Sequence, residues 1–147
     1  MREIQSFICT VASSGLHNWE ICKSIESWGI ATNGMKVNLP DVNKEDILFI
    51  YRASKGLIAT ARVKDKIKIP KSREETPWAG GMYRYGALVP FRIEREFEEP
   101  IPVKFENMRI LGTKISATSL RRGFSRVEPT DSKILLDLIR KFNQQTS

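Results

Sequence analysis

Ile47-Leu48-Phe49-Ile50-Tyr51 is the clearest strand signal in the chain. Five consecutive apolar residues of β-forming types predict a strand with both faces covered. Ser54-Lys55-Gly56 then makes a tight reversal, and Leu57 to Val63 continues as a second strand, so that the two form a hairpin. The centre of the protein is therefore predicted to be a buried, mostly antiparallel sheet.

On the N-terminal side, the pattern predicts a strand followed by a helix. Ile4 to Val11 is a mainly apolar run with the length and β-branched content of a buried strand. A turn follows, in which Ser14 is placed to cap a helix. From His17 to Ser27 apolar residues recur at helical spacing, and Gly29 is the expected stop signal. Trp28 is therefore predicted to lie at the exit of this helix.

On the C-terminal side, further strands and one final helix complete the pattern. The strand candidates are Leu88 to Phe97, Ile101 to Phe105 and Met108 to Leu111. A helix begins near Thr130, a suitable N-cap, and residues 143–147 are expected to be a disordered tail. Because closure removes exposed edges, so many strands in one small domain predict a curled sheet or partly open mixed β-barrel, with helices covering its ends. We expect a single α+β domain over residues 1–147.

Composition favours a polyanionic partner. The 147 residues carry 24 Lys+Arg against 17 Asp+Glu, a formal charge of +7, and the pI is near 9.6. Cys9 and Cys22 lie in apolar settings typical of buried thiols in a reducing compartment, and two cysteines do not make a metal site. No signal peptide or membrane span is evident, so we expect a cytoplasmic protein without cofactor or metal.

The sequence offers little for catalysis. His17 is the only histidine, and it sits at a helix start, where a solvated role is typical. Gly80-Gly81 lacks the flanking elements and the Lys-Ser/Thr of a phosphate-binding loop. Glu74-Glu75 and Glu98-Glu99 fall in charged connections typical of solvated surface.

Aromatic residues provide the stronger functional signal. A Trp followed by Gly at a helix exit leaves one ring face uncovered, and an uncovered indole on a basic protein can stack a nucleobase. Three more aromatic residues, Trp78, Tyr83 and Tyr85, lie on the connection from Lys64 to Tyr85. A connection this long in a compact domain is usually functional.

The order of short motifs resembles the EVE domain family. These motifs are Asn-Trp-Glu-Ile-Cys from Asn18, Trp-Gly at Trp28, Glu-Asp-Ile-Leu-Phe-Ile-Tyr ending at Tyr51, Pro-Phe-Arg-Ile from Pro90 and Leu-Arg-Arg-Gly-Phe from Leu120. The resemblance covers about Gln5 to Phe142. EVE domains belong to the PUA-like group, which also includes the YTH readers of methylated adenine in RNA. The resemblance implies a PUA-like pseudo-barrel with a pocket for one extruded, often modified base.

The resemblance also implies roles for individual residues. Trp28, next to Gly29, would stack the base, and Asn18 would bond the base edge. Trp78, or one of the loop tyrosines Tyr83 and Tyr85, would complete an aromatic cage. The candidates for phosphate contacts are Arg84, Arg121, Arg122 and Arg126.

Two other functions stay open at the level of sequence. Some PUA-like relatives hydrolyse nucleic acid or small amides, and Lys66 or Lys68 with Glu74 or Glu75 would then be the candidates. Alternatively, the aromatic residues form an apolar patch for a protein partner. The sequence leaves DNA versus RNA, the identity of the base and its modification, and the oligomeric state undecided.

Overall fold

The computed structural model describes residues 3–146. A six-stranded sheet with the strand order β2-β5-β4-β3-β1-β8 forms its centre. These strands are β1 (Ser6–Val11), β2 (Ser27–Ala31), β3 (Ile47–Arg52), β4 (Gly56–Val63), β5 (Tyr85–Ile101) and β8 (Phe124–Val127). Only β1 and β3 run parallel; the other neighbours in this sheet are antiparallel.

The sheet is strongly curled. The 17-residue strand β5 pairs with β2 over its first part and with β4 over its second part. Register shifts interrupt the ladders β2·β5, β3·β4 and β4·β5, and such bulges bend strands and increase twist. The result is a half-barrel whose two edge strands are β2 and β8. The predicted α+β class with a partly open mixed β-barrel is confirmed.

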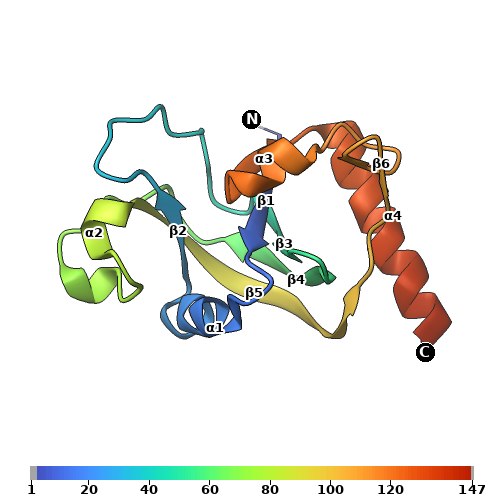
Figure 1. The fold of residues 1–147 in the computed structure, drawn as a ribbon, viewed down its shortest axis with the longest axis horizontal. Helices are drawn as coiled ribbons and strands as arrows, with labels where there is room; N and C mark the ends of the chain where they lie inside the picture. Colours follow the sequence, from blue (N-terminus) through green and yellow to red (C-terminus); the bar gives the residue numbers. More distant parts are fainter. Residues whose placement is uncertain (1–2, 147) are drawn as a thin grey trace.

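Helices pack on both faces of this sheet, and Figure 1 shows α1 and α4 on different sides of it. The helices are α1 (Leu16–Ile25), α2 (Gly81–Arg84), α3 (Ala117–Arg121) and α4 (Pro129–Thr146), with a 3-10 turn η1 (Arg73–Glu75). A separate hairpin joins β6 (Phe105–Glu106) to β7 (Arg109–Ile110).

Alternation along the strands divides the core in two. Phe7 and Cys9 of β1 belong to the cluster under α1, whereas Ile8 between them packs with Leu135 and Ile139 of α4. Period-2 alternation sends successive side chains to opposite faces, so both faces of β1 are apolar and covered. Burial on both faces fixes the register of this strand, because a shift by one residue would exchange the two clusters.

The first helix ends earlier than the sequence predicts. Glu26 takes the left-handed conformation (φ 52°) at the C-cap, and its N–H bonds to carbonyls of the last turn. The expectation that Gly29 stops the helix is wrong, since β2 begins immediately at Ser27 and contains Trp28 and Gly29. The expectation of a Ser14 cap is also wrong, because Gly15 is the N-cap and no side chain bonds there.

The remaining elements follow the sequence with shifted limits. The predicted hairpin β3–β4 is confirmed. The predicted strand over Leu88 to Phe97 is part of the longer β5, which takes in Ile101. The candidate Met108 to Leu111 contains β7. The candidate Ile101 to Phe105 is wrong, because Ile101 ends β5, residues 102–104 are in no strand, and Phe105 begins β6. The final helix starts at Pro129 and continues to Thr146, so the expected disordered tail is helical up to that residue. Ser147 lies outside the described residues.

Candidate nucleic-acid interface

A cavity of about 440 Å³ lies at the open seam of the half-barrel. Its walls come from the edge strand β2, from the edge strand β8 with the preceding α3, from the ends of β1 and α1, and from the connection before β5. The volume falls within the range of about 300–1,000 Å³ that is typical of small-molecule sites. The cavity therefore exists because the two edge strands do not pair with each other.

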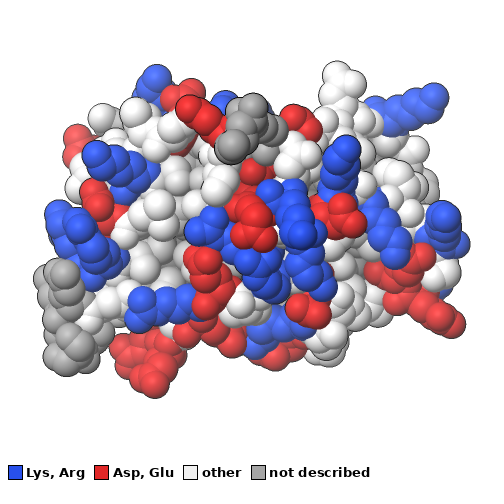
Figure 2. All heavy atoms as spheres, turned by 180° about the vertical axis from the view of Figure 1, so that it is seen from behind, with Lys and Arg blue, Asp and Glu red and all other residues white. Residues whose placement is uncertain are grey.

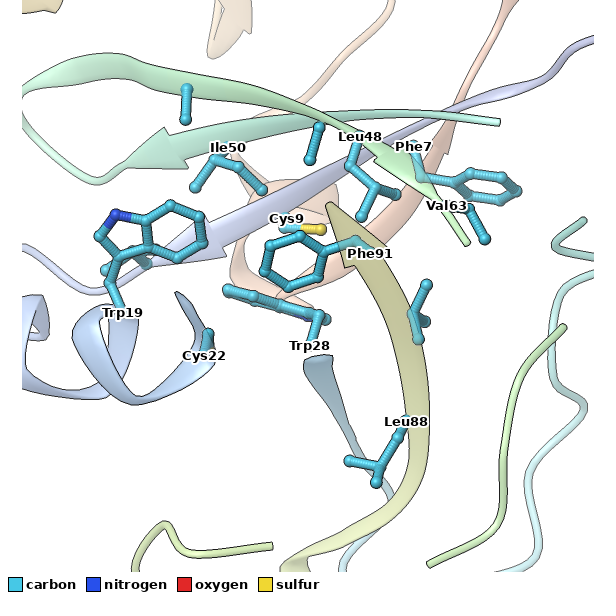
Figure 3. Close-up of a cluster of buried hydrophobic side chains, with 14 of the residues drawn as sticks. Phe7, Cys9, Trp19, Cys22, Trp28, Leu48, Ile50, Val63, Leu88 and Phe91 are labelled. Atoms are coloured by element: carbon cyan, nitrogen blue, oxygen red, sulfur yellow. The ribbon is translucent and has the colours of Figure 1, made fainter. Parts of the chain in front are cut away.

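Trp28 forms the inner wall of this cavity and is largely buried. Only 8% of the residue is exposed, and its ring belongs to the cluster under α1. Figure 3 shows Trp28 pointing from β2 into this cluster, beside Cys9 and Phe91. The ring thus has two roles in the structure: most of it is core, and the remainder lines the cavity.

Trp78 and Tyr85 form a second aromatic wall. Their ring centroids are 5.1 Å apart and the rings are tilted by 58°. The Trp78 indole N–H donates to the Asn18 carbonyl oxygen of α1 at 3.3 Å, which ties the long connection to the helix. Gly29 lies directly beneath both rings: a Cβ there would be 2.9 Å from Tyr85 Cδ1 and 3.1 Å from Trp78 Cζ3. Only glycine allows this close approach of strand and rings.

Backbone hydrogen bonds hold the second wall against β2. The N–H groups of Thr32 and Asn33 donate to the Arg84 carbonyl at 2.8 and 3.2 Å. The Thr32 hydroxyl accepts from Gly86 N–H at 3.0 Å, next to the register shift between β2 and β5. The position of Tyr85 is therefore fixed from both sides by the backbone.

Positive charge gathers on the cavity. Arg84, Arg121 and Arg122 line it, and none of the described residues in its lining is acidic. The Arg84 guanidinium lies 5.2 Å from the centroid of the Tyr85 ring, within the range of a cation–π contact. Elsewhere the charges are mixed: on the face shown in Figure 2, acidic and basic side chains are interleaved. The seam thus combines aromatic walls with cations that no carboxylate in the lining neutralises.

Two polar groups of α1 complete the lining. Asn18 is exposed, and among the described residues none hydrogen-bonds its side chain, which leaves the amide available to a ligand. Burial raises the pKa of the Cys22 thiol to about 12, and the nearby Trp78 indole N–H, which favours the thiolate, offsets this only in part. Cys22 is therefore a neutral, largely apolar part of the wall at physiological pH.

The structure brings all but two of the predicted site residues together. Asn18, Trp28, Gly29, Trp78, Tyr85, Arg84, Arg121 and Arg122 line one cavity. Tyr83 does not line it; the residue is 72% exposed and lies against Gly34 instead. Arg126 does not line it either, because it lies further along β8 and borders a different depression with Lys133 of α4.

Cys22 and Phe124 are among the lining residues that the sequence analysis did not assign to the site. Cys22 stands four residues after Asn18, so helical spacing alone places them on one face of α1. Phe124 stacks on Phe7 of β1 with centroids 5.1 Å apart. Its place in the cavity depends on the pairing of β8 with β1, which no local pattern reveals.

The residues considered for catalysis lie elsewhere. Lys68 and Glu75 form an ion pair at 2.6 Å, and neither of them, nor Lys66, Glu74 or His17, lines the cavity. Within residues 3–146 no group of three or more His, Cys, Asp or Glu is placed to hold a metal ion. No helix in that range is long and apolar enough to cross a membrane.

Comparison with known proteins places the fold. The chain matches no family model, and no curated protein matches it. Among solved structures, it is similar to a hypothetical protein from Leishmania major, with a TM-score of 0.60, 12% identity and 99% of this chain and 98% of that chain covered. It is also similar to the YTH domain of the Zygosaccharomyces rouxii MRB1 protein in complex with N6-methyladenosine RNA, with a TM-score of 0.53, 16% identity and 94% and 90% covered. It is similar as well to the Pho92 YTH domain in complex with m6A, with a TM-score of 0.51 and 14% identity, and the match covers 94% of this chain and 87% of that chain. The fold of this chain is therefore similar to that of YTH domains.

Proposed function

We propose that this chain is an EVE-type reader domain that binds nucleic acid and holds one flipped, modified base in the seam cavity. The observation that carries the proposal is the composition of that cavity: rings on two walls, three arginines and no acidic residue in the described lining. Two solved neighbours of the same fold were determined with N6-methyladenosine ligands, which supports a modified base as the ligand class.

The energetics of base flipping require more than one ring. Extruding a base from a stack costs a few kcal/mol, whereas stacking on one aromatic side chain returns about 1–3 kcal/mol. Stacking on Trp28 alone would therefore only about offset the cost of extruding the base. The tilted pair Trp78 and Tyr85 adds a second apolar surface, and a methyl group enclosed there would add about 0.8 kcal/mol. Selectivity for a modified base would therefore arise where the second wall meets the first.

Each lining group then has a distinct task. The Asn18 amide offers both a donor and an acceptor to the edge of the base. The absence of a side chain on Gly29 brings the rings of Tyr85 and Trp78 close to β2. Arg121 and Arg122 at the end of α3, with Arg84 across the cavity, would contact the phosphates on either side of the flipped nucleotide.

A nucleoside panel tests the proposal directly. N6-methyladenosine, 5-methylcytidine and the unmodified nucleosides are titrated while tryptophan fluorescence is followed. We expect the quenching to be strongest for a modified nucleoside. Tyr85→Ala should weaken the affinity for that nucleoside about 5- to 150-fold, which corresponds to the loss of one stacking ring. Tyr51→Phe is the matched control, because Tyr51 packs on the opposite face of the sheet. A panel in which no nucleoside binds would reject the proposal.

Salt dependence separates this function from a protein-interaction module. Binding to phosphates weakens with salt, and for single strands the slope of log K against log salt is about −0.7 per phosphate contact. Arg121→Gln and Arg122→Gln should each reduce that slope for a short oligonucleotide. Arg140→Gln on α4 removes the same charge away from the cavity and should leave the slope unchanged. Equal slopes in all three variants would contradict the assignment of the arginines.

A further inference from the structure

Tyr83 is an exposed aromatic ring that the structure holds in a defined place. The residue is 72% exposed, and yet its ring lies against the Cα of Gly34 so closely that a Cβ there would be 2.9 Å from Cδ2 and nearer still to Cε2. Gly34 has a φ of +74°, which glycine adopts at little cost. Its N–H donates to the Tyr83 carbonyl at 2.7 Å. The ring is thus supported on one side and open to solvent over most of its surface.

Tyr83 directly precedes a residue that lines the seam cavity. One residue separates it from Tyr85, and that residue is Arg84, which lines the cavity, as Tyr85 does. The same backbone bonds that fix Tyr85 against β2 also fix Tyr83, because Thr32, Asn33 and Gly34 donate in succession to the carbonyls of Arg84 and Tyr83. Adjacent Cα atoms are 3.8 Å apart, so the Cα atoms of Tyr83 and Tyr85 lie within about 7.6 Å. A strand that leaves the cavity past Arg84 therefore passes close to Tyr83.

We infer that Tyr83 stacks the nucleobase next to the flipped one, so that the domain binds a short single strand and not an isolated nucleotide. This inference rests on the proposed function. A nucleotide that leaves the stack exposes a face of its neighbour, and an aromatic side chain can cover that face regardless of sequence. Arg84, between the two rings, is placed to neutralise the phosphate that joins the two nucleotides.

The test compares a nucleoside with a strand. The probes are free N6-methyladenosine, an RNA pentamer with N6-methyladenosine at its centre, and the same pentamer with abasic sites beside the centre. Tyr83→Ala should leave nucleoside affinity within about twofold and weaken pentamer affinity about 5- to 150-fold, the effect of one lost stack. The wild type should lose a similar factor on the abasic pentamer, whereas Tyr83→Ala should be insensitive to it.

Tyr83→Phe is the matched variant, because it keeps the ring and removes only the hydroxyl; we expect wild-type affinity for the pentamer. Exposure of Tyr83 predicts that both variants unfold at the wild-type denaturant concentration. Wild-type pentamer affinity in Tyr83→Ala would overturn the inference while leaving the cavity assignment intact. Equal losses for nucleoside and pentamer would overturn it as well. If the wild type binds neither free N6-methyladenosine nor the pentamer that contains it, the proposed function itself fails.

Discussion

Replacing Gly29 with alanine tests how closely β2 fits beneath the second aromatic wall. The new methyl group would be 2.9 Å from Tyr85 Cδ1 and 3.1 Å from Trp78 Cζ3, so the rings must give by a few tenths of an ångström. Overpacking of this kind costs about 1–3 kcal/mol, and the lower chain entropy of alanine offsets about 0.5–1 kcal/mol of it. We expect a net loss of about 0–2.5 kcal/mol in the free energy of unfolding, measured by guanidinium titration. Nucleoside affinity should fall about tenfold, because both displaced rings line the cavity.

A double-mutant cycle identifies the cause of that loss. Tyr85→Ala removes the ring that the new methyl group meets first, so Gly29→Ala should cost less in that background. The coupling between the two substitutions should exceed about 0.5 kcal/mol, beyond the additivity expected of independent sites. Additive losses would refute the close fit as the reason, and unchanged stability with unchanged nucleoside affinity would refute the wall itself.

Buried groups around the cavity and the sheet give three more expectations. Trp28→Ala should lower the free energy of unfolding by about 3–5 kcal/mol in denaturant titration, since the ring is mostly core, and Trp28→Phe should lower it by less than half of that. The pKa of the Cys22 thiol is raised in the folded state from 9.0 to about 12. The protonated thiol therefore contributes fully to the free energy of unfolding below pH 9, and this contribution is lost as the pH rises toward 12. Iodoacetamide should modify Cys22 slowly at pH 8 until the protein is unfolded. Asp46→Ala should cost about 2–4 kcal/mol by urea titration, because the buried carboxylate accepts N–H bonds from Gln5 and Asn43, both at 2.9 Å.

Local patterns predicted the inner strands well, but they missed the edge strands β2 and β8 and misplaced the first helix end. The apolar run of β3 and the reversal before β4 are local features, and the structure reproduces them. The helix end depends on a competition that the sequence does not display. Gly29 is the favoured residue for a left-handed C-cap, yet Glu26 adopts that conformation, because the following residues are needed to pair with β5. Tertiary pairing thus overrode a correct local preference.

The candidate site shows the same division between local and long-range information. The Trp-Gly pair singled out Trp28, and the long connection before β5 singled out Trp78 and Tyr85. Their convergence requires the order of strands in the sheet and the path of the connection before β5. Arg126 illustrates the limit: its charge made it a candidate, but its place further along β8 puts it on another depression.

The open seam explains why fold and function are separable in this chain. Pairing β2 with β8 would complete the barrel and satisfy both edges, but it would also eliminate the cavity. The chain instead covers the gap with rings from both edges, Trp28 on one side and Phe124 on the other, and places arginines at the rim. The buried strands β1, β3 and β4 form the core around which the seam residues are arranged. Substitutions at the rim should therefore alter ligand choice at little cost in stability, whereas Trp28, which is both core and wall, cannot change one property without the other.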